Sequence, residues 1–151
     1  MKVVKFLATV AVMVLFWGSA AAACINTNSK FLAKQTVHRC AQWFDTAVEA
    51  GWETWQLPKL DYIMWRESRC LTGVINKTLN SDKSWDYGLL QINDRSWCKK
   101  TKWYPMGYLQ SVNVLDYCVD LLEPHTNLKA AKALYDYSQK TTKNGFNPWG
   151  L

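Results

Sequence analysis

Glu67 is the residue whose position in the sequence points most directly to chemistry. It follows Leu60 by seven residues and Ile63 by four, so a continuing helix places its carboxyl group on the apolar stripe that these residues form. Burial disfavours the charged form of a carboxyl group, which keeps a proton available near neutral pH. Such a group is suited to general acid catalysis. The alternative is a glutamate at a helix end that pairs with Arg66 or Arg69.

A second carboxyl group, that of Asp86, lies 19 residues after Glu67. Its polar neighbours Ser81, Asp82 and Lys83 predict a hairpin in which Asp86 stays solvated and ionised. A protonated carboxylic acid and a carboxylate together cleave a glycosidic bond, because the acid protonates the leaving oxygen while the anion stabilises the sugar cation. Without such a partner, Asp86 is a turn-forming residue.

Helices and one hairpin region are predicted to position these two residues. Apolar residues recur at helical spacing in four segments, at about residues 29–50, 58–68, 112–122 and 128–135. Gly51 ends the first helix, Pro58 begins the second and Pro124 ends the third. Residues 71–93 mix Asn, Ser, Asp and Gly with short apolar pieces, which indicates an irregular hairpin. The predicted fold class is therefore α+β and mostly α, with a small β-hairpin inserted after the second helix.

Residues 1–23 have the pattern of a secretory signal peptide. Lys2 and Lys5 precede an apolar run over residues 6–17, and a run of small residues ends at Ala23. The apolar run is shorter than the roughly 20 residues that a membrane-spanning helix needs. We therefore expect no transmembrane span, and a single catalytic domain over residues 24–151 that is monomeric.

The charged residues and the histidines limit the range of partners and cofactors. Residues 24–151 contain 16 Lys and Arg against 12 Asp and Glu, and the basic residues are scattered along the chain. A nucleic-acid groove needs a denser basic patch, so no nucleic acid is expected, whereas the small positive excess fits an anionic polymer. His38 and His125 have no neighbouring ligand set, and no cysteine spacing is typical of zinc. We expect neither a metal nor a cofactor.

Five cysteines follow residue 23, and an exported protein normally pairs an even number of them. Four cysteines allow three pairings, of which topology favours one. Two helices with a short connection run antiparallel, which brings Cys40 near Cys70, and Cys98 would then bond to Cys118. Cys24 remains and directly follows the small-residue run. It is either the lipid anchor of a bacterial lipoprotein or a free thiol.

Two strings of residues resemble the lysozyme-like superfamily. Glu67-Ser68 at a helix end, followed by Gly88-Leu89-Leu90-Gln91-Ile92, is similar to the motif of lytic transglycosylases and goose-type lysozymes. The string from Asp86 to Asn93, followed by Trp97-Cys98, is similar to the substrate-cleft strand of chicken-type lysozymes. The resemblance implies a lysozyme-like fold in which the hairpin flanks the substrate cleft.

The resemblance also implies a role for each matching residue. Glu67 matches the catalytic acid, and Asp86 matches the second carboxylate of chicken-type lysozymes, which stabilises or captures the glycosyl cation. Gln91 and Asn93 match residues that hold the substrate, with Asn93 near an N-acetyl group. Trp97 matches a tryptophan that packs on a sugar ring, and the alternative for it is a core tryptophan.

The function implied by the resemblance is that of an exported muramidase. Such an enzyme hydrolyses the β-1,4 bond between N-acetylmuramic acid and N-acetylglucosamine in peptidoglycan. The runner-up is a lytic transglycosylase, which cleaves the same bond to a 1,6-anhydro product, but transglycosylases usually have a small or apolar residue in place of Asp86. A non-catalytic glycan binder and a disulfide-stapled protein without a site are less favoured. Five cysteines, against the eight of chicken-type lysozymes, favour a bacterial or phage-borne member.

Overall fold

The structure, a computed structural model, describes residues 37–151. Its α-helices are α1 (Phe44–Glu49), α2 (Leu57–Ser68), α3 (Asp94–Trp97), α4 (Tyr108–Ser111) and α5 (Pro124–Thr142). Its short 3-10 helices are η1 (Ala41–Trp43), η2 (Thr54–Gln56), η3 (Cys118–Leu122) and η4 (Asn147–Trp149). No helix among these described residues is long and apolar enough to cross a membrane. The expected signal segment, residues 1–23, and Cys24 lie outside the described residues.

Three short strands, β1 (Ile75–Asn76), β2 (Asp86–Tyr87) and β3 (Ile92–Asn93), form an antiparallel sheet in the order β1-β2-β3. Asp86 in the central strand is opposite Asn76 on one side and Asn93 on the other. Directly opposed residues of an antiparallel sheet point to the same face. The register therefore gathers a carboxylate and two amides on one face of the sheet.

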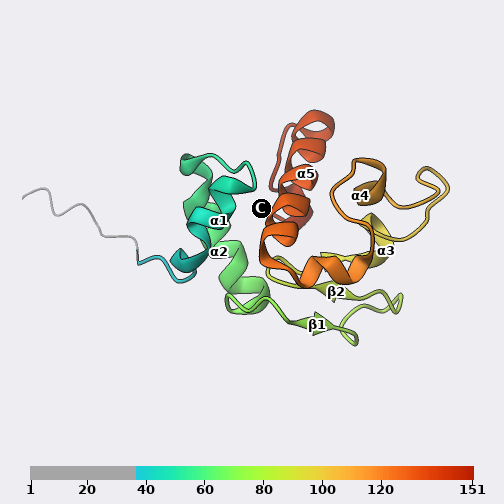
Figure 1. The fold of residues 1–151 in the computed structure, drawn as a ribbon, viewed down its shortest axis with the longest axis horizontal. Coiled ribbons are helices and arrows are strands. Elements are labelled where there is room, and N and C mark those ends of the chain that lie inside the picture. Colours follow the sequence, from blue (N-terminus) through green and yellow to red (C-terminus); the bar gives the residue numbers. More distant parts are fainter. Residues whose placement is uncertain (1–36) are drawn as a thin grey trace, which may run out of the picture. The chain divides into compact units, whose positions relative to one another are not determined.

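Helix α5 forms the centre of the helical part. In Figure 1, α1 and α2 lie on one side of α5, while α3 and α4 lie on the other, and α1, η3 and η4 pack against it. Its residues Leu128, Ala131 and Leu134 are almost fully buried. The helix begins at Pro124, which was expected to end the preceding helix, because a first-turn proline lacks only an N–H that has no partner within the helix. It extends well beyond the predicted range of 128–135.

The helix predicted for residues 29–50 begins later in the part that the structure describes. Residues 37–40 are not helical, and η1 starts at Ala41. The carboxylate of Asp61, in α2, accepts hydrogen bonds from the backbone N–H groups of Arg39 (2.9 Å) and Cys40 (2.7 Å). A side chain from another helix thus binds the two N–H groups that directly precede η1 and holds them outside the helical segment.

The helix predicted for residues 112–122 is wrong. The chain there leaves α4, makes a turn and then forms η3. Val112 and Val119 are 42% and 57% exposed, whereas Leu115 is buried. Asn113 has a φ of 55°, the left-handed conformation that commonly follows a helix end. The apolar spacing thus came from two separate segments rather than from one continuous helix.

Disulfide bonds join Cys40 to Cys70 and Cys98 to Cys118, the same two pairs that the topology argument favoured. The first connects the residue before η1 to the turn that follows α2. The second connects the end of α3 to the start of η3. Each bond thus has one cysteine in a segment that flanks the sheet, since Cys70 precedes β1 and Cys98 follows β3 along the chain.

Removing the bond between Cys40 and Cys70 is expected to lower the stability of the fold. The double variant C40A/C70A opens a loop with a sequence separation of 30 residues, and the free energy of unfolding should fall by about 2 to 4 kcal/mol. Urea unfolding followed by tryptophan fluorescence measures this change. C98A/C118A, with a separation of 20 residues, is the matched comparison and should lose slightly less. An unchanged urea midpoint for C40A/C70A would contradict the expectation.

Candidate active site

Glu67 lies in the last turn of α2, next to the buried Ser68. Leu60 and Ile63 are fully buried, whereas the side chain of Glu67 is 25% exposed. Glu67 is thus half-buried at the edge of the buried face rather than on the fully buried stripe. Arg66 donates to Oε1 of Glu67 from Nε (2.9 Å) and from Nη2 (2.5 Å). Of the two arginines that the alternative interpretation named, Arg66 forms the ion pair.

Arg66 connects Glu67 to the last turn of the described chain. Its Nη2 also donates to the backbone carbonyl of Trp149, in η4, at 2.6 Å. The carboxylate of Glu67 raises the pKa of the Arg66 guanidinium, because the hydrogen bonds between them favour the charged arginine. Since both arginine donors contact Oε1, the second oxygen of Glu67 has no hydrogen bond within the described residues.

The end of α2 is attached to the turn that follows β2. The hydroxyl of Ser68 donates to the backbone carbonyl of Leu89 at 2.8 Å. Directly after the helix, Arg69 and Cys70 take left-handed φ values of 56° and 66°, which turns the chain sharply away from the helix axis. Together these features fix Glu67 relative to the strand that carries Asp86.

Three amide side chains hold the carboxylate of Asp86. Nδ2 of Asn93 donates to Oδ1 at 2.7 Å, and Nδ2 of Asn80 donates to Oδ2 at 2.8 Å. Nδ2 of Asn76 makes a longer contact with Oδ2, at 3.4 Å. Amide N–H groups complement the negative charge of a carboxylate and do not neutralise it with a counter-ion. The three amides therefore hold the Asp86 side chain in one orientation on the face of the sheet.

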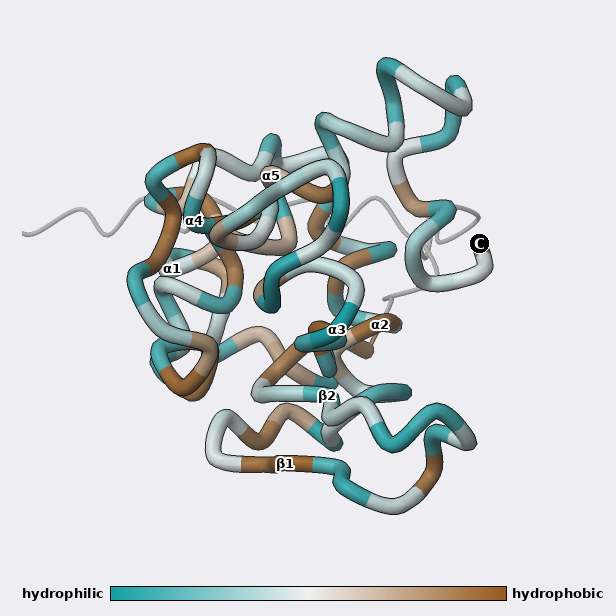
Figure 2. The backbone as a smooth tube through the Cα atoms, turned by 90° about the vertical axis from the view of Figure 1, so that its right-hand side faces the viewer, coloured by the Kyte–Doolittle hydropathy of each residue, from teal (hydrophilic) through white to brown (hydrophobic). Residues whose placement is uncertain are grey.

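The loop between β1 and β2, residues 77–85, is mainly hydrophilic and carries Asn80 (Figure 2). Asp82 anchors this loop by accepting from the hydroxyl and the backbone N–H of Ser84 and by pairing with Arg95 at 3.1 Å. These contacts lower the pKa of Asp82 from its usual 3.8 to about 2. The stability that they supply is thus complete above about pH 4 and is lost as the pH falls through about 2. The loop keeps this anchor at neutral and mildly acidic pH.

A buried asparagine holds the turn between β2 and β3. Asn127, on α5, is fully buried, accepts from the N–H of Leu90 at 3.0 Å and donates to the carbonyls of Tyr87 (3.0 Å) and Leu121 (2.7 Å). In the same turn Gly88 has a φ of 73°, and a Cβ atom there would lie 2.2 Å from the carbonyl oxygen of Leu121. Only glycine fits this close approach of the turn to η3.

Gln91 also takes a left-handed conformation, with a φ of 47°. Its Nε2 donates to the carbonyl of Gly88 at 2.8 Å and to that of Val74 at 3.3 Å. These bonds use the donor end of the amide within the protein. The acceptor end, Oε1, has no hydrogen bond among the described residues.

Glu67 and Asp86 line the same cleft, which has a volume of about 490 Å³. The other residues that line it are Arg66, Val74, Asn76, Leu79, Gln91, Asn93 and Pro148. The structure thus brings together four of the five residues for which the sequence implied a role in catalysis or substrate binding. A second pocket of about 380 Å³ shares Leu79 and Asn93 with this cleft, so the polar surface continues beyond the sheet.

Trp97 is the residue that the geometry does not bring to the cleft. Its ring packs edge-on against Tyr108, with ring centroids 5.7 Å apart, and against Tyr137, with centroids 5.8 Å apart. It is half-buried in an aromatic cluster between α3, α4 and α5. Its position agrees with the alternative interpretation of a packing tryptophan.

Sequence reasoning did not assign a role to Asn76, Asn80 or Asn127. The first two were seen only as members of a polar, turn-rich segment, and their convergence on Asp86 depends on the strand register. Asn127 did leave a signal, because a polar residue four positions before Ala131 lies on the apolar stripe of α5. A buried polar side chain at such a position normally satisfies backbone groups.

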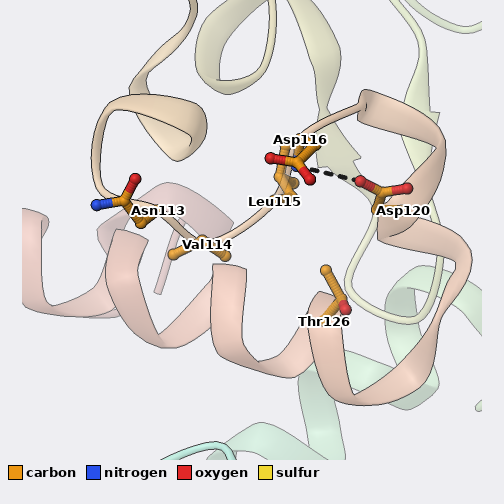
Figure 3. Close-up of a pocket in the computed structure, with 6 residues that line it drawn as sticks. All are labelled: Asn113, Val114, Leu115, Asp116, Asp120 and Thr126. Atoms are coloured by element: carbon orange, nitrogen blue, oxygen red, sulfur yellow. Dashed lines mark hydrogen bonds between the residues drawn. The ribbon is translucent and has the colours of Figure 1, made fainter.

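A further pocket of about 310 Å³ lies between the segment after α4 and the start of α5 (Figure 3). Asp116 and Asp120 both line it, and Oδ2 of Asp120 accepts the N–H of Asp116 at 3.1 Å. Among residues 37–151, no group of three or more His, Cys, Asp or Glu side chains could hold a metal ion. The pocket contains none of the residues that line the cleft with Glu67 and Asp86.

The comparisons with known proteins agree with this architecture. Residues 30–141 match the model of the C-type lysozyme/alpha-lactalbumin family. No curated protein matches the sequence. Among solved structures, a lysozyme from Litopenaeus vannamei is similar, with 22% sequence identity and a TM-score of 0.53 over 71% of this chain and 74% of that chain. The helix-rich domain with its small antiparallel sheet has the lysozyme fold, as the sequence predicted.

Proposed function

Because the chain belongs to the C-type lysozyme/alpha-lactalbumin family, we propose that it is an exported muramidase that hydrolyses peptidoglycan. The bond cleaved is the β-1,4 linkage between N-acetylmuramic acid and N-acetylglucosamine. One observation carries the proposal: Glu67, at the end of α2, and Asp86, on the central strand, face one cleft. Two carboxyl groups on the walls of a single groove are the arrangement that glycoside hydrolysis requires.

The two carboxyl groups have different surroundings and therefore different roles. Glu67 protonates the glycosidic oxygen as the bond breaks and later removes a proton from the incoming water. The carboxylate of Asp86, held by its amide donors, stabilises the positive charge that develops on the sugar ring. Among the cleft residues, Oε1 of Gln91 and the amide of Asn93 are placed to contact the sugar.

The anionic residue at position 86 favours hydrolysis over transglycosylation. A lytic transglycosylase uses one glutamate and lets the C6 hydroxyl of the sugar attack the cationic centre. Such a reaction needs no second carboxylate, yet here Asn76, Asn80 and Asn93 all direct an amide at Asp86. The three donors fix the orientation of Asp86 within the cleft, and this supports a direct role for its carboxylate in the reaction.

Arg66 positions the carboxylate of Glu67, because two of its donors contact Oε1. The variant R66Q removes both contacts, so the rate of peptidoglycan cleavage should fall by a few-fold. The loss is small because both side chains are partly exposed, by 35% and 25%, and an exposed ion pair is weak. Initial rates of peptidoglycan cleavage at one fixed pH measure it.

The matched control for this prediction is R69Q. Arg69 lies on the same helix end and donates to the carbonyls of Trp65 and Arg66, with no contact to Glu67. Its removal changes the net charge equally and should leave the rate of cleavage unchanged. A loss of the same size in R69Q would mean that general charge, and not the contact with Glu67, sets the rate.

The proposed site of action is outside the cytoplasm. Residues 1–23 would be removed during export, and residues 24–151 would act as a monomer, either secreted or held at a membrane through a lipid on Cys24. The disulfides between Cys40 and Cys70 and between Cys98 and Cys118 support an oxidising compartment. A bacterial or phage-borne source remains a prediction.

Incubation of the purified protein with insoluble, purified peptidoglycan tests the proposal. We expect soluble disaccharide-peptide fragments to accumulate with time. Cosedimentation of the protein with peptidoglycan without release of fragments would contradict the proposal and would instead indicate a glycan-binding protein on the lysozyme fold.

A further inference from the structure

The loop between α3 and α4, residues 99–107, presents apolar side chains to solvent. Trp103 is 74% exposed and Met106 is 67% exposed, and Pro105 between them is exposed as well. In Figure 1 this connection extends away from α5 at the edge of the domain. Neither Trp103 nor Met106 lines the cleft that contains Glu67. The proposed cleavage of glycans therefore does not account for this surface.

The same part of the chain accounts for the net positive charge of residues 24–151. Residues 95–115 include four Lys and Arg and no Asp or Glu. The rest of residues 24–151 contains equal numbers of basic and acidic residues, 12 of each. The excess charge of the domain is thus located in one segment, and the exposed apolar residues lie within it.

Two of these four cations have carboxylate partners and two do not. Arg95 and Lys99 each pair with an aspartate, at 3.1 Å and 2.5 Å. Lys100 and Lys102 pair with no carboxylate among the described residues. Nζ of Lys102 lies 4.6 Å from the ring centroid of Trp103, so the free charge is directly next to the exposed aromatic ring.

Backbone and side-chain contacts hold the loop in one conformation. The N–H of Thr101 donates to the carbonyl of Tyr104 at 2.9 Å, and the N–H of Gly107 donates to the same carbonyl at 3.1 Å. The hydroxyl of Thr101 accepts from the N–H groups of Trp103 and Tyr104. The bond between Cys98 and Cys118 fixes the base of the loop. A surface ordered before binding loses little conformational entropy when it docks.

The chemistry of the loop fits a lipid surface better than a glycan. A sugar site combines an aromatic face with acidic or amide side chains that bind hydroxyl groups, but residues 99–107 contain no such side chain. The hydroxyl of Thr101 already accepts two backbone N–H groups. Tryptophan at the level of the lipid headgroups, with lysines beside it, is typical of proteins that lie on anionic bilayers.

We propose that residues 99–107 dock the protein onto an anionic phospholipid surface. Trp103 and Met106 enter the interfacial region, while Lys100 and Lys102 contact the lipid phosphates. Tyr117, which is 72% exposed and lines one pocket together with Met106, extends the apolar surface. This docking requires no cleavage of glycans, so it is independent of the proposed muramidase activity.

Cosedimentation with vesicles tests this inference. The purified protein should bind vesicles made of equal parts of phosphatidylglycerol and phosphatidylcholine, and it should not bind vesicles of phosphatidylcholine alone. The variant K100Q/K102Q should bind about 25-fold more weakly, at about fivefold per lysine. The variant W103S/M106S should bind about tenfold more weakly, because it loses the apolar part of the contact.

Matched controls exist elsewhere in the chain. K129Q/K140Q removes two exposed lysines of α5, and W55S removes an exposed tryptophan of η2. Both should bind as the unaltered protein does, and thermal unfolding should confirm that all variants are folded. If the protein bound no vesicles, or if the loop variants bound as well as the controls, the proposal would be overturned. If W103S/M106S bound normally while soluble dextran sulfate competed, the partner would be an anionic polymer and not a lipid.

Discussion

The variant Glu67→Gln should cleave peptidoglycan about a thousandfold more slowly than the unaltered protein. Glutamine keeps the shape of the side chain but has no acidic proton to give to the glycosidic oxygen and no basic oxygen to accept one from water. The loss should appear in kcat and much less in KM, because the change removes an interaction of the transition state. Initial rates at several peptidoglycan concentrations separate the two constants.

The fold should not change in this variant. Glu67 is 25% exposed, and Arg66 is its partner in an ion pair of the kind that contributes about 1 kcal/mol or less to stability. Glu49→Gln is the matched control, since Glu49 is exposed at the end of α1 and lies outside the cleft. It should retain full activity. Turnover by Glu67→Gln at the rate of the unaltered protein would remove Glu67 from the mechanism.

The variant Asp86→Asn should lower kcat by about a hundredfold. It removes the negative charge that we propose stabilises the sugar cation, while the side chain keeps its size. Both oxygens of Asp86 accept hydrogen bonds, Oδ1 from Asn93 and Oδ2 from Asn80. An asparagine at this position therefore directs an NH₂ group at another NH₂ group, and the free energy of unfolding should also fall by about 1 to 3 kcal/mol.

Asp82→Asn provides the control for Asp86→Asn. Asp82 lies in the same loop and pairs with Arg95, but it does not line the cleft with Glu67. Its replacement removes the same charge and should leave kcat within a few-fold of the unaltered value. Full activity of Asp86→Asn would support a mechanism with one glutamate, in which Asp86 only shapes the loop.

The helix that carries Glu67, the proposed catalytic acid, was predictable because its signals are local. Leu60, Ile63 and Met64 at helical spacing and Pro58 in the first turn predict a helix over residues 58–68, and the structure has α2 at Leu57–Ser68. The partner of Glu67 was named among two candidates, since adjacent arginines are visible in the sequence. The contact of Arg66 with the carbonyl of Trp149 spans 83 residues and depends on the tertiary fold.

The helix predicted for residues 112–122 shows where periodicity fails. Val112, Leu115 and Val119 have helical spacing, but only Leu115 reaches the core. Short segments held by a disulfide and by a turn at Asn113 place apolar residues without a helix. The spacing of apolar residues indicates which residues would lie on the same face of a helix. It does not show that a single continuous helix contains them.

The hydrogen-bond partners of Asp86 could not be predicted from the sequence, for a different reason. A carboxylate next to polar residues was expected, but the contacts with Asn76 and Asn93 follow from the register of three strands of two residues each. Such short strands carry too little alternation of apolar and polar residues to set a register from the sequence. The role of Asn80 depends on the path of the loop that connects β1 to β2.

Mass spectrometry of the sugar ends that the protein releases from purified peptidoglycan tests the central claim, that Glu67 and Asp86 together hydrolyse the glycosidic bond. Protein carrying Glu67→Gln serves as the blank. We predict fragments that end in a reducing N-acetylmuramic acid, because water attacks the cation that Asp86 stabilises. Fragments lighter by one water, with a 1,6-anhydro end, would contradict the account and identify a lytic transglycosylase.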